Sequence, residues 1–233
     1  MISVIISTNR PERMENVFRN YARQRLKDKE MIVVLHGEHM DADAWRREAE
    51  RHDRVSVYTM PKKASVGACK NFAVRKAKHR YVAKFDDDDY YGSYYLSELY
   101  KAFKTKKADV VGKSRSFAYV TKYRALLLRR GDAERGRAKQ LRGPTIAARK
   151  SIFKKVKWPD RGRGGDKVFL KRCVRRGLKL YATGKYNFVY IRGDRTAHTW
   201  GIGAKQFMKR CAFVRRTDDY RPYVDRRVKG GHR

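Results

Sequence analysis

The first 91 residues alternate four times between a short apolar run and a segment with helical spacing, and this alternation limits the fold more than any other feature of the chain. The apolar runs are residues 3–7, 31–35, 55–58 and 81–85. They are rich in Val, Ile and Tyr, which favour strands. Strands that alternate with helices predict an α/β fold with a mainly parallel sheet flanked by helices, and ligands bind such sheets at the carboxyl edge.

The segments between these runs carry helix signals. Pro11 suits the first turn of a helix, and the apolar residues Met14, Val17 and Phe18 follow it at three- and four-residue spacing. Ser65 suits the N-cap of the helix that precedes the fourth run. These signals support the prediction of helices between the strands.

Four consecutive acids, Asp86 to Asp89, follow the fourth apolar run directly. Two unit charges about 4 Å apart repel by roughly 4 kcal/mol at an effective dielectric constant near 20, so carboxylates gathered at a strand end need a cation. A divalent ion meets that need, and oxygen ligands favour Mg²⁺ or Mn²⁺ over Zn²⁺. If the extended geometry continues, Asp86 and Asp88 point to the same side and can share one ion. The alternative is a solvated acidic turn or an acid-rich helix start.

The chain carries 59 Lys and Arg against 24 Asp and Glu, a formal net charge of +35. The excess lies late in the sequence, because residues 1–100 hold 19 basic against 15 acidic residues while residues 101–233 hold 40 against 9. Such an excess predicts an anionic partner for the second part: a phosphate polymer, an acidic glycan, a membrane surface or nucleic acid. The alternative is a basic surface that serves solubility alone.

The sequence also bears on the compartment. No stretch approaches 18 consecutive apolar residues, and the N-terminus lacks the basic leader and cleavage site of a signal peptide. Cys69, Cys173 and Cys211 are few and widely spaced, which fits a reducing compartment. We therefore expect a cytoplasmic protein.

After residue 91 the pattern loosens. We expect helices at residues 94–103 and 167–176, and strands at residues 109–112, 116–120, 145–148, 178–182 and 187–191. Residues 131–143 form a long polar loop, predicted to be functional or mobile rather than inert. Residues 204–215 predict a basic amphipathic helix, and residues 216–233 a fraying tail. We see no linker that would divide two domains.

Four motifs together resemble the metal-dependent GT-A glycosyltransferases of family 2. They are SVIISTNRP at residues 3–11, SVGACKN at residues 65–71, the Asp86 cluster as a DxD motif, and Gly164-Gly165-Asp166. The resemblance is nearest to small bacterial members that modify surface or spore-coat glycans. It implies a GT-A, Rossmann-like domain over residues 1–200, with a nucleotide-sugar-binding half at residues 1–100 and an acceptor half at residues 101–200. A basic C-terminal helix and tail would follow at residues 201–233.

The resemblance implies a nucleotide-diphosphate-sugar donor, with a UDP-sugar favoured, and an inverting displacement at the anomeric carbon. Carried over by position, the donor-binding residues are Thr8, Asn9, Arg10, Gly67, Lys70, Asn71, Asp86 and Asp87. Asp86, Asp88 and His198 would hold Mn²⁺ or Mg²⁺, which neutralises the charge on the leaving diphosphate. Many members read the nucleotide base with an Asp after the second strand, and here His36 or Glu38 would substitute for it.

Asp166 matches the family's catalytic base, the carboxylate that takes the proton of the acceptor hydroxyl in an inverting transfer. It is isolated, since Asp160 is the only other acid between Glu134 and Asp194. It also opens a predicted helix, where the helix dipole favours a carboxylate and where an Asp can serve simply as a cap. Many family members have an acid beside the base, but this chain has Gly165 there.

The resemblance also gives the basic excess an interpretation. The excess falls in the predicted acceptor half, and a nucleotide diphosphate with its metal does not need it. We therefore expect an anionic glycan or polymer as the acceptor, or an acceptor met through peripheral contact with the inner face of an anionic membrane. No specific nucleic-acid partner is expected.

Other classes of protein share part of this pattern. A basic chain with acids suited to Mg²⁺ also fits a nucleic-acid-binding or metal-dependent nucleic-acid-processing protein, although no RNP, helix-turn-helix or zinc-finger pattern is present. A nucleotidyltransferase would carry a Gly-rich phosphate loop where Thr8-Asn9-Arg10 stands. A non-catalytic module with this fold would not need its acids intact at Asp86 and Asp166.

Overall fold

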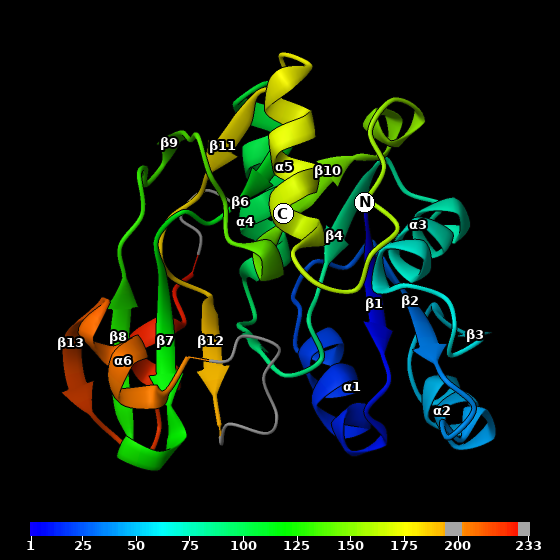
Figure 1. Cartoon of the computed structure of the whole chain (residues 1–233), viewed down its shortest axis with the longest axis horizontal. Coiled ribbons are helices and arrows are strands. Elements are labelled where there is room, and N and C mark those ends of the chain that lie inside the picture. Colours follow the sequence, from blue (N-terminus) through cyan, green and yellow to red (C-terminus); the bar gives the residue numbers. More distant parts are fainter. Residues whose placement is uncertain (194–201, 228–233) are drawn as a thin grey trace.

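The computed structural model describes residues 1–193 and 202–227, and within them the strands form two sheets that lie side by side (Figure 1). The larger sheet has eight strands in the order β3-β2-β1-β4-β10-β6-β11-β9. In that order their bounds are Val55–Met60, Lys29–His36, Ile2–Thr8, Tyr81–Lys84, Ala147–Arg149, Val110–Gly112, Leu180–Ala182 and Gly136–Arg137.

The strand directions confirm a mainly parallel α/β sheet. β1 pairs in parallel with β2 on one side and with β4 on the other, so that Ile2 lies opposite both Lys29 and Tyr81. β10 runs antiparallel to both of its neighbours, β4 and β6, and β11 is parallel to β6. Because β1 and β4 are adjacent and parallel, the residues that follow them emerge at the same carboxyl edge.

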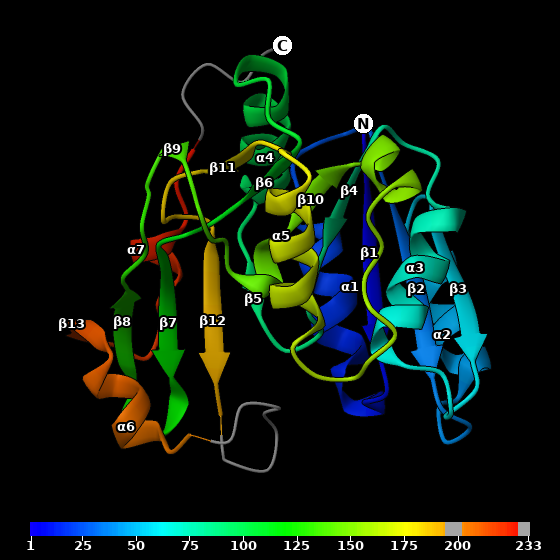
Figure 2. The same cartoon turned by 45° about the horizontal axis from the view of Figure 1, so that its top comes forward.

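Helices cover both faces of the larger sheet (Figures 1 and 2). One face packs against α1 (Met14–Ala22), α2 (Ala42–Glu50) and α4 (Tyr95–Thr105), and the other against α3 (Val66–Lys76) and α5 (Gly165–Arg175). Val4 and Ile6 belong to the first core and Ile5 to the second, so each face of β1 is buried. Burial on both faces explains why these strands appear in the sequence as continuous apolar runs.

The N-cap predicted at Ser65 is confirmed. Its hydroxyl oxygen accepts a hydrogen bond from the backbone N–H of Ala68 at 3.0 Å, which satisfies one of the free donors at the start of α3. Pro11 occupies the first position of the 3-10 helix η1 (Pro11–Arg13), which leads directly into α1. The helices predicted in the first 91 residues are thus all present.

The smaller sheet was not foreseen as a separate unit. Its five strands follow the order β13-β8-β7-β12-β5. Their bounds are Cys211–Arg216, Ala125–Arg129, Ser116–Val120, Phe188–Arg192 and Tyr90–Tyr91. β5 begins directly after Asp89 and pairs with β12, so the four acids lie on the connection between β4 of the larger sheet and β5 of the smaller one.

The basic helix predicted over residues 204–215 is wrong beyond its first half. α6 ends at Lys209 (Ala204–Lys209), and the next residues form the strand β13, which pairs antiparallel with β8. β8 offers a free edge with the apolar sequence Ala125-Leu126-Leu127-Leu128. Cross-strand pairing with that edge outweighs the helical spacing of the apolar residues, since aromatic and β-branched side chains such as Phe213 and Val214 suit strands.

The predicted fraying tail is also wrong for its described part. The short helix α7 (Arg221–Val224) buries Val224 completely against the smaller sheet. The hydroxyl of Tyr90 in β5 donates a hydrogen bond of 2.7 Å to the carboxylate of Asp225, and this bond connects the C-terminal segment to the smaller sheet. The remaining 3-10 helices are η2 (Thr121–Tyr123), η3 (Gly143–Thr145) and η4 (Lys150–Lys154).

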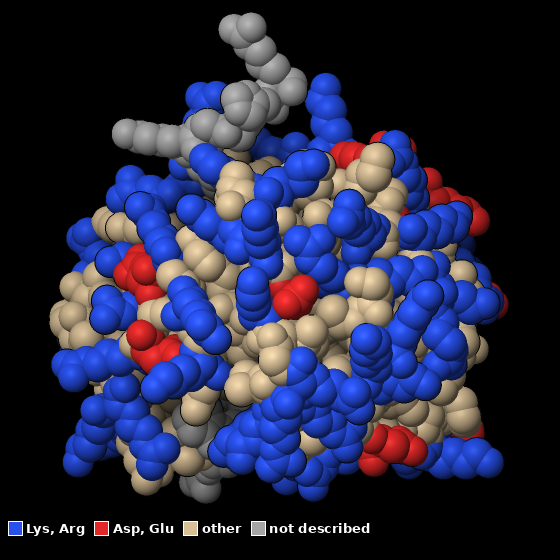
Figure 3. Space-filling model, turned by 90° about the horizontal axis from the view of Figure 1, so that it is seen from above, with Lys and Arg blue, Asp and Glu red and all other residues tan. Residues whose placement is uncertain are grey.

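The surface reflects the basic composition. Lys and Arg side chains cover much of the face shown in Figure 3, with few Asp and Glu side chains between them. Within residues 1–193 and 202–227, no helix has both the length and the apolar character needed to cross a bilayer.

Candidate functional site

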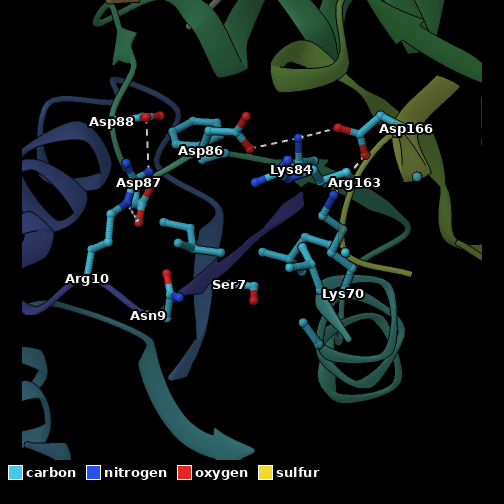
Figure 4. Close-up of a pocket in the computed structure, with 18 residues that line it drawn as sticks. Ser7, Asn9, Arg10, Lys70, Lys84, Asp86, Asp87, Asp88, Arg163 and Asp166 are labelled. Carbon is cyan, nitrogen blue, oxygen red and sulfur yellow. Dashed lines mark hydrogen bonds and ion pairs between the residues drawn. The ribbon is translucent and has the colours of Figure 1, made fainter. Parts of the chain in front are cut away.

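A cavity of about 640 Å³ opens at the carboxyl edge of the larger sheet, beside β1, β4 and the loop that leads into α5 (Figure 4). We call it the edge cavity. Its lining includes seven of the residues predicted for the site, namely Asn9, Arg10, Lys70, Asp86, Asp87, Asp88 and Asp166. All four sequence motifs contribute to this lining, the last of them also through Gly164 and Gly165. The fold therefore gathers motifs that are far apart in the sequence.

The four acids do not continue the strand. β4 ends at Lys84, and the chain turns at Asp87 and Asp88, so the alternation expected of an extended strand does not apply. Asp87 and Asp89 are buried, whereas the side chains of Asp86 and Asp88 are 31% and 16% exposed. Asp86 and Asp88 both face the cavity, although a turn rather than the pleat of a strand places them there.

Arg10 neutralises the middle of the acidic turn. Its guanidinium forms an ion pair with Asp87 and lies 3.0 Å from a carboxylate oxygen of Asp88. The hydroxyl of Thr8 donates a 2.5 Å hydrogen bond to the oxygen of Asp87 that also accepts from Nε of Arg10. Thr8 and Arg10 thus support the acids from the end of β1, and Thr8 itself does not line the cavity.

Burial makes this turn electrostatically costly. It raises the pKa of Asp88 to about 6, with the charges of Asp87 and Asp86 adding to the effect and Arg10 opposing it. Burial also raises the pKa of Asp89 well above its usual value. One oxygen of Asp89 accepts the backbone N–H of Ile191 on β12 at 3.0 Å, and the other has no hydrogen-bond partner among the described residues. The turn therefore holds two carboxyl groups, those of Asp88 and Asp89, whose ionisation burial disfavours.

Asp166 lies in the first turn of α5, in contact with two lysines. Its two carboxylate oxygens accept hydrogen bonds from Lys70 at 2.9 Å and from Lys84 at 2.7 Å. The indole N–H of Trp158 donates a third, at 3.0 Å. Despite burial, the two ammonium groups hold the pKa of Asp166 well below its usual range. The helix begins two residues earlier than predicted, and Asp166 makes no N-cap bond with its side chain.

Lys84 joins the two acidic parts of the site and was missed in the sequence. Its ammonium lies 2.7 Å from oxygens of both Asp86 and Asp166, and 3.2 Å from the carbonyl oxygen of Gly143 (Figure 4). The side chain is 4% exposed. A charged residue inside an apolar strand run, two positions before the acids, was the available signal.

Trp158 was also missed. Trp158 packs against Phe153 and Phe169 in the second core, which aims its indole N–H at Asp166. Arg163 lines the edge cavity from the loop before α5 (Figure 4). No spacing in the sequence indicated that Trp158 lies at the site.

Two predicted donor-binding residues brace the loop before α5. A side chain at Gly67 would clash with the backbone oxygen of Pro159, so the close approach of α3 to this loop requires glycine. The amide of Asn71 exchanges two hydrogen bonds with the backbone of Trp158, at 2.9 and 3.1 Å. Neither residue lines the edge cavity.

Two histidines, His36 and His198, were also predicted for the site. His36 ends β2, where its ring contacts the carbonyl oxygen of Lys62 at 3.0 Å, and it does not line the edge cavity. His198 lies outside the described residues.

The acidic turn suits a hard divalent cation. Among residues 1–193 and 202–227 no group of three or more His, Cys, Asp and Glu side chains could enclose a metal ion. Asp86 and Asp88 nevertheless face the cavity together, and Asp88 keeps an elevated pKa that a nearby cation would lower. Mg²⁺ is commonly bound by one or two carboxylates together with substrate phosphates. The residues present fit such a shared site.

Residues 3–157 match the family described as glycosyl transferase family 2, and the chain belongs to that family. Among curated proteins, none matches the sequence. Solved structures show the same fold at low sequence identity. The chain is similar to residues 1–349 of TarS from S. aureus in complex with UDP-GlcNAc, with a TM-score of 0.67 and 17% identity over 88% of this chain and 63% of that one.

Two further structures are similar in the same way. A crystal structure of S. aureus TarS gives a TM-score of 0.66 and 16% identity over 83% of this chain and 37% of that one. The mannosyltransferase PcManGT from Pyrobaculum calidifontis, in complex with GDP-Man and Mn²⁺, gives a TM-score of 0.62 and 15% identity over 86% and 58%. The chain thus has the GT-A fold predicted from its motifs, and it spans less than two thirds of each of these structures.

Proposed function

We propose that this chain transfers a sugar from a nucleotide-diphosphate-sugar, most readily a UDP-sugar, to an anionic glycan or polymer, with inversion at the anomeric carbon. The observation that carries the proposal is the edge cavity of this family 2 chain, where three acids form ion pairs with three cationic side chains. The acids are Asp86, Asp88 and Asp166, and the cations are Arg10, Lys70 and Lys84. The similar structures of TarS and PcManGT bind UDP-GlcNAc and GDP-Man, which supports a nucleotide-sugar donor. Family membership favours glycosyl transfer over nucleic-acid processing.

The donor would lie along the carboxyl ends of β1 and β4. Asn9 and Arg10 would flank the nucleotide, and Lys70 would approach the diphosphate from α3. Asp86 and Asp88 would hold Mn²⁺ or Mg²⁺, which supplies Lewis-acid stabilisation of the leaving diphosphate. Binding of the cation would relieve the repulsion that raises the pKa of Asp88.

Asp166 would act as the general base. As the acceptor oxygen bonds to the anomeric carbon and the bond from that carbon to the diphosphate oxygen breaks, Asp166 takes the proton of the acceptor hydroxyl. Its contacts with Lys70 and Lys84 make it a weak base before the donor binds, since both ammonium groups favour the ionised form. The phosphates of the donor are competing partners for these lysines, and a shift of either lysine toward them strengthens the base.

The acceptor would meet the basic part of the chain. Arg163 already lines the edge cavity, and the exposed loop around it carries Arg161. Opposite charges on an acceptor raise its local concentration near such a surface. A phosphate-containing or acidic glycan, free or presented at an anionic membrane, fits this requirement.

Calorimetry with a panel of nucleoside diphosphates and their sugars, in Mn²⁺ and in EDTA, tests the proposal. We expect one diphosphate to bind in Mn²⁺. At a diphosphate concentration a hundredfold above its dissociation constant, binding should raise the free energy of unfolding by about 2.7 kcal/mol. Absence of binding by every member of the panel, in protein that is folded, would refute a nucleotide-sugar donor.

A further inference from the structure

A second cavity, of about 560 Å³, lies between α4, the connection from β11 to β12, and the C-terminal segment. We call it the α4 cavity. Five cationic side chains line it, namely Lys101, Lys106, Arg135, Arg226 and Arg227, together with Tyr181 and Tyr186. Glu98 is the one acid of its lining. The α4 cavity shares no lining residue with the edge cavity.

The acid in this lining is already neutralised. One oxygen of Glu98 lies 3.0 Å from the ammonium of Lys113, which is fully buried, and the other accepts the backbone N–H of Gly184 at 2.9 Å. Lys113 also donates to the hydroxyl of Thr183 at 3.2 Å and to the carbonyl oxygen of Gly184 at 2.6 Å. The negative charge of Glu98 is therefore satisfied within the wall of the cavity, and the arginines and lysines dominate the field inside it.

The wall that carries two of the arginines is fixed in place. Asn187, which adopts a left-handed backbone conformation with φ of 64°, accepts the backbone N–H of Arg226 at 2.9 Å through its side-chain oxygen. Its own backbone N–H donates to the carbonyl oxygen of Val224 at 2.9 Å. These bonds hold the C-terminal segment against the connection from β11 to β12, so Arg226 and Arg227 are presented by a rigid wall.

The lining combines cations with aromatic rings. The guanidinium of Arg226 lies 5.2 Å from the centre of the Tyr186 ring, and the ring of Tyr181 is partly exposed on β11. Guanidinium groups bind phosphate in a bidentate manner, and tyrosine rings offer apolar faces with a polar tip. A chain that alternates sugar rings with phosphates presents the complementary groups.

We propose that the α4 cavity binds a stretch of a phosphodiester-linked glycan, at a distance from the sugar that reacts. The proposal rests on the proposed function, because it takes this glycan to be the acceptor of the edge cavity. A chain held at two sites gains affinity without further contacts at the reacting end. The α4 cavity therefore retains the acceptor and takes no part in bond formation.

The test uses a fluorescein-labelled oligomer of six phosphodiester-linked hexoses and the full chain. The variant Arg135→Gln/Arg226→Gln/Arg227→Gln removes three exposed cations from the cavity. We expect fluorescence anisotropy to show about tenfold weaker binding of the oligomer, since charge-assisted contacts to phosphate are lost. A neutral hexasaccharide should not bind measurably to either protein.

A matched control removes the same charge elsewhere. Lys171→Gln/Arg175→Gln/Arg176→Gln changes three exposed cations of α5 and its end, none of which lines the α4 cavity. We expect this control to bind the oligomer like the unchanged chain. Equal weakening in both variants, or no weakening in the cavity variant, would reduce the effect to overall charge and overturn the proposal.

Two further measurements separate the possible causes. Single-stranded DNA with six phosphates must bind more weakly than the glycan, and tighter binding of the DNA to the same arginines would assign the cavity to nucleic acid instead. Nucleoside-diphosphate binding at the edge cavity should be unchanged in the cavity variant. Loss of glycan binding with intact diphosphate binding supports the α4 cavity, whereas failure of the unchanged chain to bind any diphosphate contradicts the proposed function and not this site.

Discussion

The ammonium of Lys84 lies 2.7 Å from a carboxylate oxygen of Asp166, although 82 positions separate the two residues in the chain. Lys84 reaches Asp86 at the same distance, so one buried cation links the acidic turn after β4 to the start of α5. The proposed metal ligand and the proposed base are thereby held on opposite sides of a single side chain (Figure 4).

Lys84→Met should destabilise the protein, because it removes a buried cation and leaves the partly buried carboxylate of Asp166 with Lys70 and Trp158 as its remaining partners. Breaking a buried pair by removing one partner costs about 3 kcal/mol in the free energy of unfolding. Urea denaturation measures the loss. The double variant Lys84→Met/Asp166→Asn should lose less than the sum of the two single variants, and strict additivity would show that the pair is not coupled.

Asp166→Asn should keep donor binding and lose transfer. General-base catalysis contributes roughly 10² to 10⁴ in rate, and the amide cannot accept the proton. Transfer is measured as the single-turnover rate of the variant and of the unchanged chain, and donor binding is measured by calorimetry with the nucleoside diphosphate. Asp160→Asn, an exposed acid in the preceding loop, is the matched control and should transfer at the normal rate. Transfer by Asp166→Asn within roughly threefold of the unchanged chain would leave Asp166 without a catalytic role.

The sequence predicted the part of the fold that depends on local pattern. The alternation of apolar runs and helices predicted the strands β1 to β4 of the larger sheet, and the side chain of Ser65 caps α3 as expected. The smaller sheet depends on pairing between distant segments, and the apolar spacing around Phe213 did not reveal that β8 would be its partner. Strand pairing of this kind is a tertiary effect that local propensity does not determine.

The same distinction holds for the site. The motifs located Arg10, Asp88 and Asp166 at one cavity, because residues after parallel strands meet at one edge. They did not locate Lys84, whose role follows from its burial between two carboxylates. Nor did they predict the α4 cavity, whose arginines come from two distant parts of the chain.

Stability without metal should fall as pH rises from about 4 to about 6. Burial raises the pKa of Asp88 to about 6 in the folded protein, whereas an Asp in the unfolded chain has a pKa of about 4, so the native state binds the proton more tightly than the unfolded state between these values. Ionisation above this window then costs the native state up to about 3 kcal/mol. Burial raises the pKa of Asp89 in the same direction.

Urea denaturation at pH 5 and pH 7 in EDTA checks this dependence. Asp88→Asn should be more stable than the unchanged chain at pH 7. The difference in the free energy of unfolding between the two proteins should be smaller at pH 5, because Asp88 is then largely protonated. Asp166 does not interfere with this test. Its pKa is lowered in the folded protein, so its contribution to stability changes only at pH values below the ordinary pKa of an Asp. A difference in unfolding free energy that is equal at both pH values would contradict the raised pKa of Asp88.

Metal and donor should bind together through Asp88. In Asp88→Asn we expect calorimetry to show weak diphosphate binding that is the same in Mn²⁺ and in EDTA, because one of the two carboxylates that face the cavity beside the phosphates is lost. The fold should persist, as reported by circular dichroism. If the unchanged chain itself binds diphosphate equally in Mn²⁺ and EDTA, the proposed metal role is wrong.

The charge of the acceptor should appear in the salt dependence of transfer. Exposed charges interact over a Debye length of about 8 Å at physiological ionic strength, so a KM for an anionic acceptor that depends on exposed arginines should rise steeply between about 50 and 300 mM NaCl. The KM for the donor should change less, because the proposed metal anchors it in a partly buried cavity.

Arg161→Gln/Arg163→Gln should raise the acceptor KM and flatten its salt dependence, since Arg163 lines the edge cavity. Arg175→Gln/Arg176→Gln removes the same charge from the far end of α5 and should do neither. An acceptor KM that is flat across this range, or a neutral oligosaccharide used as well as an acidic one, would show that the basic surface does not select the acceptor.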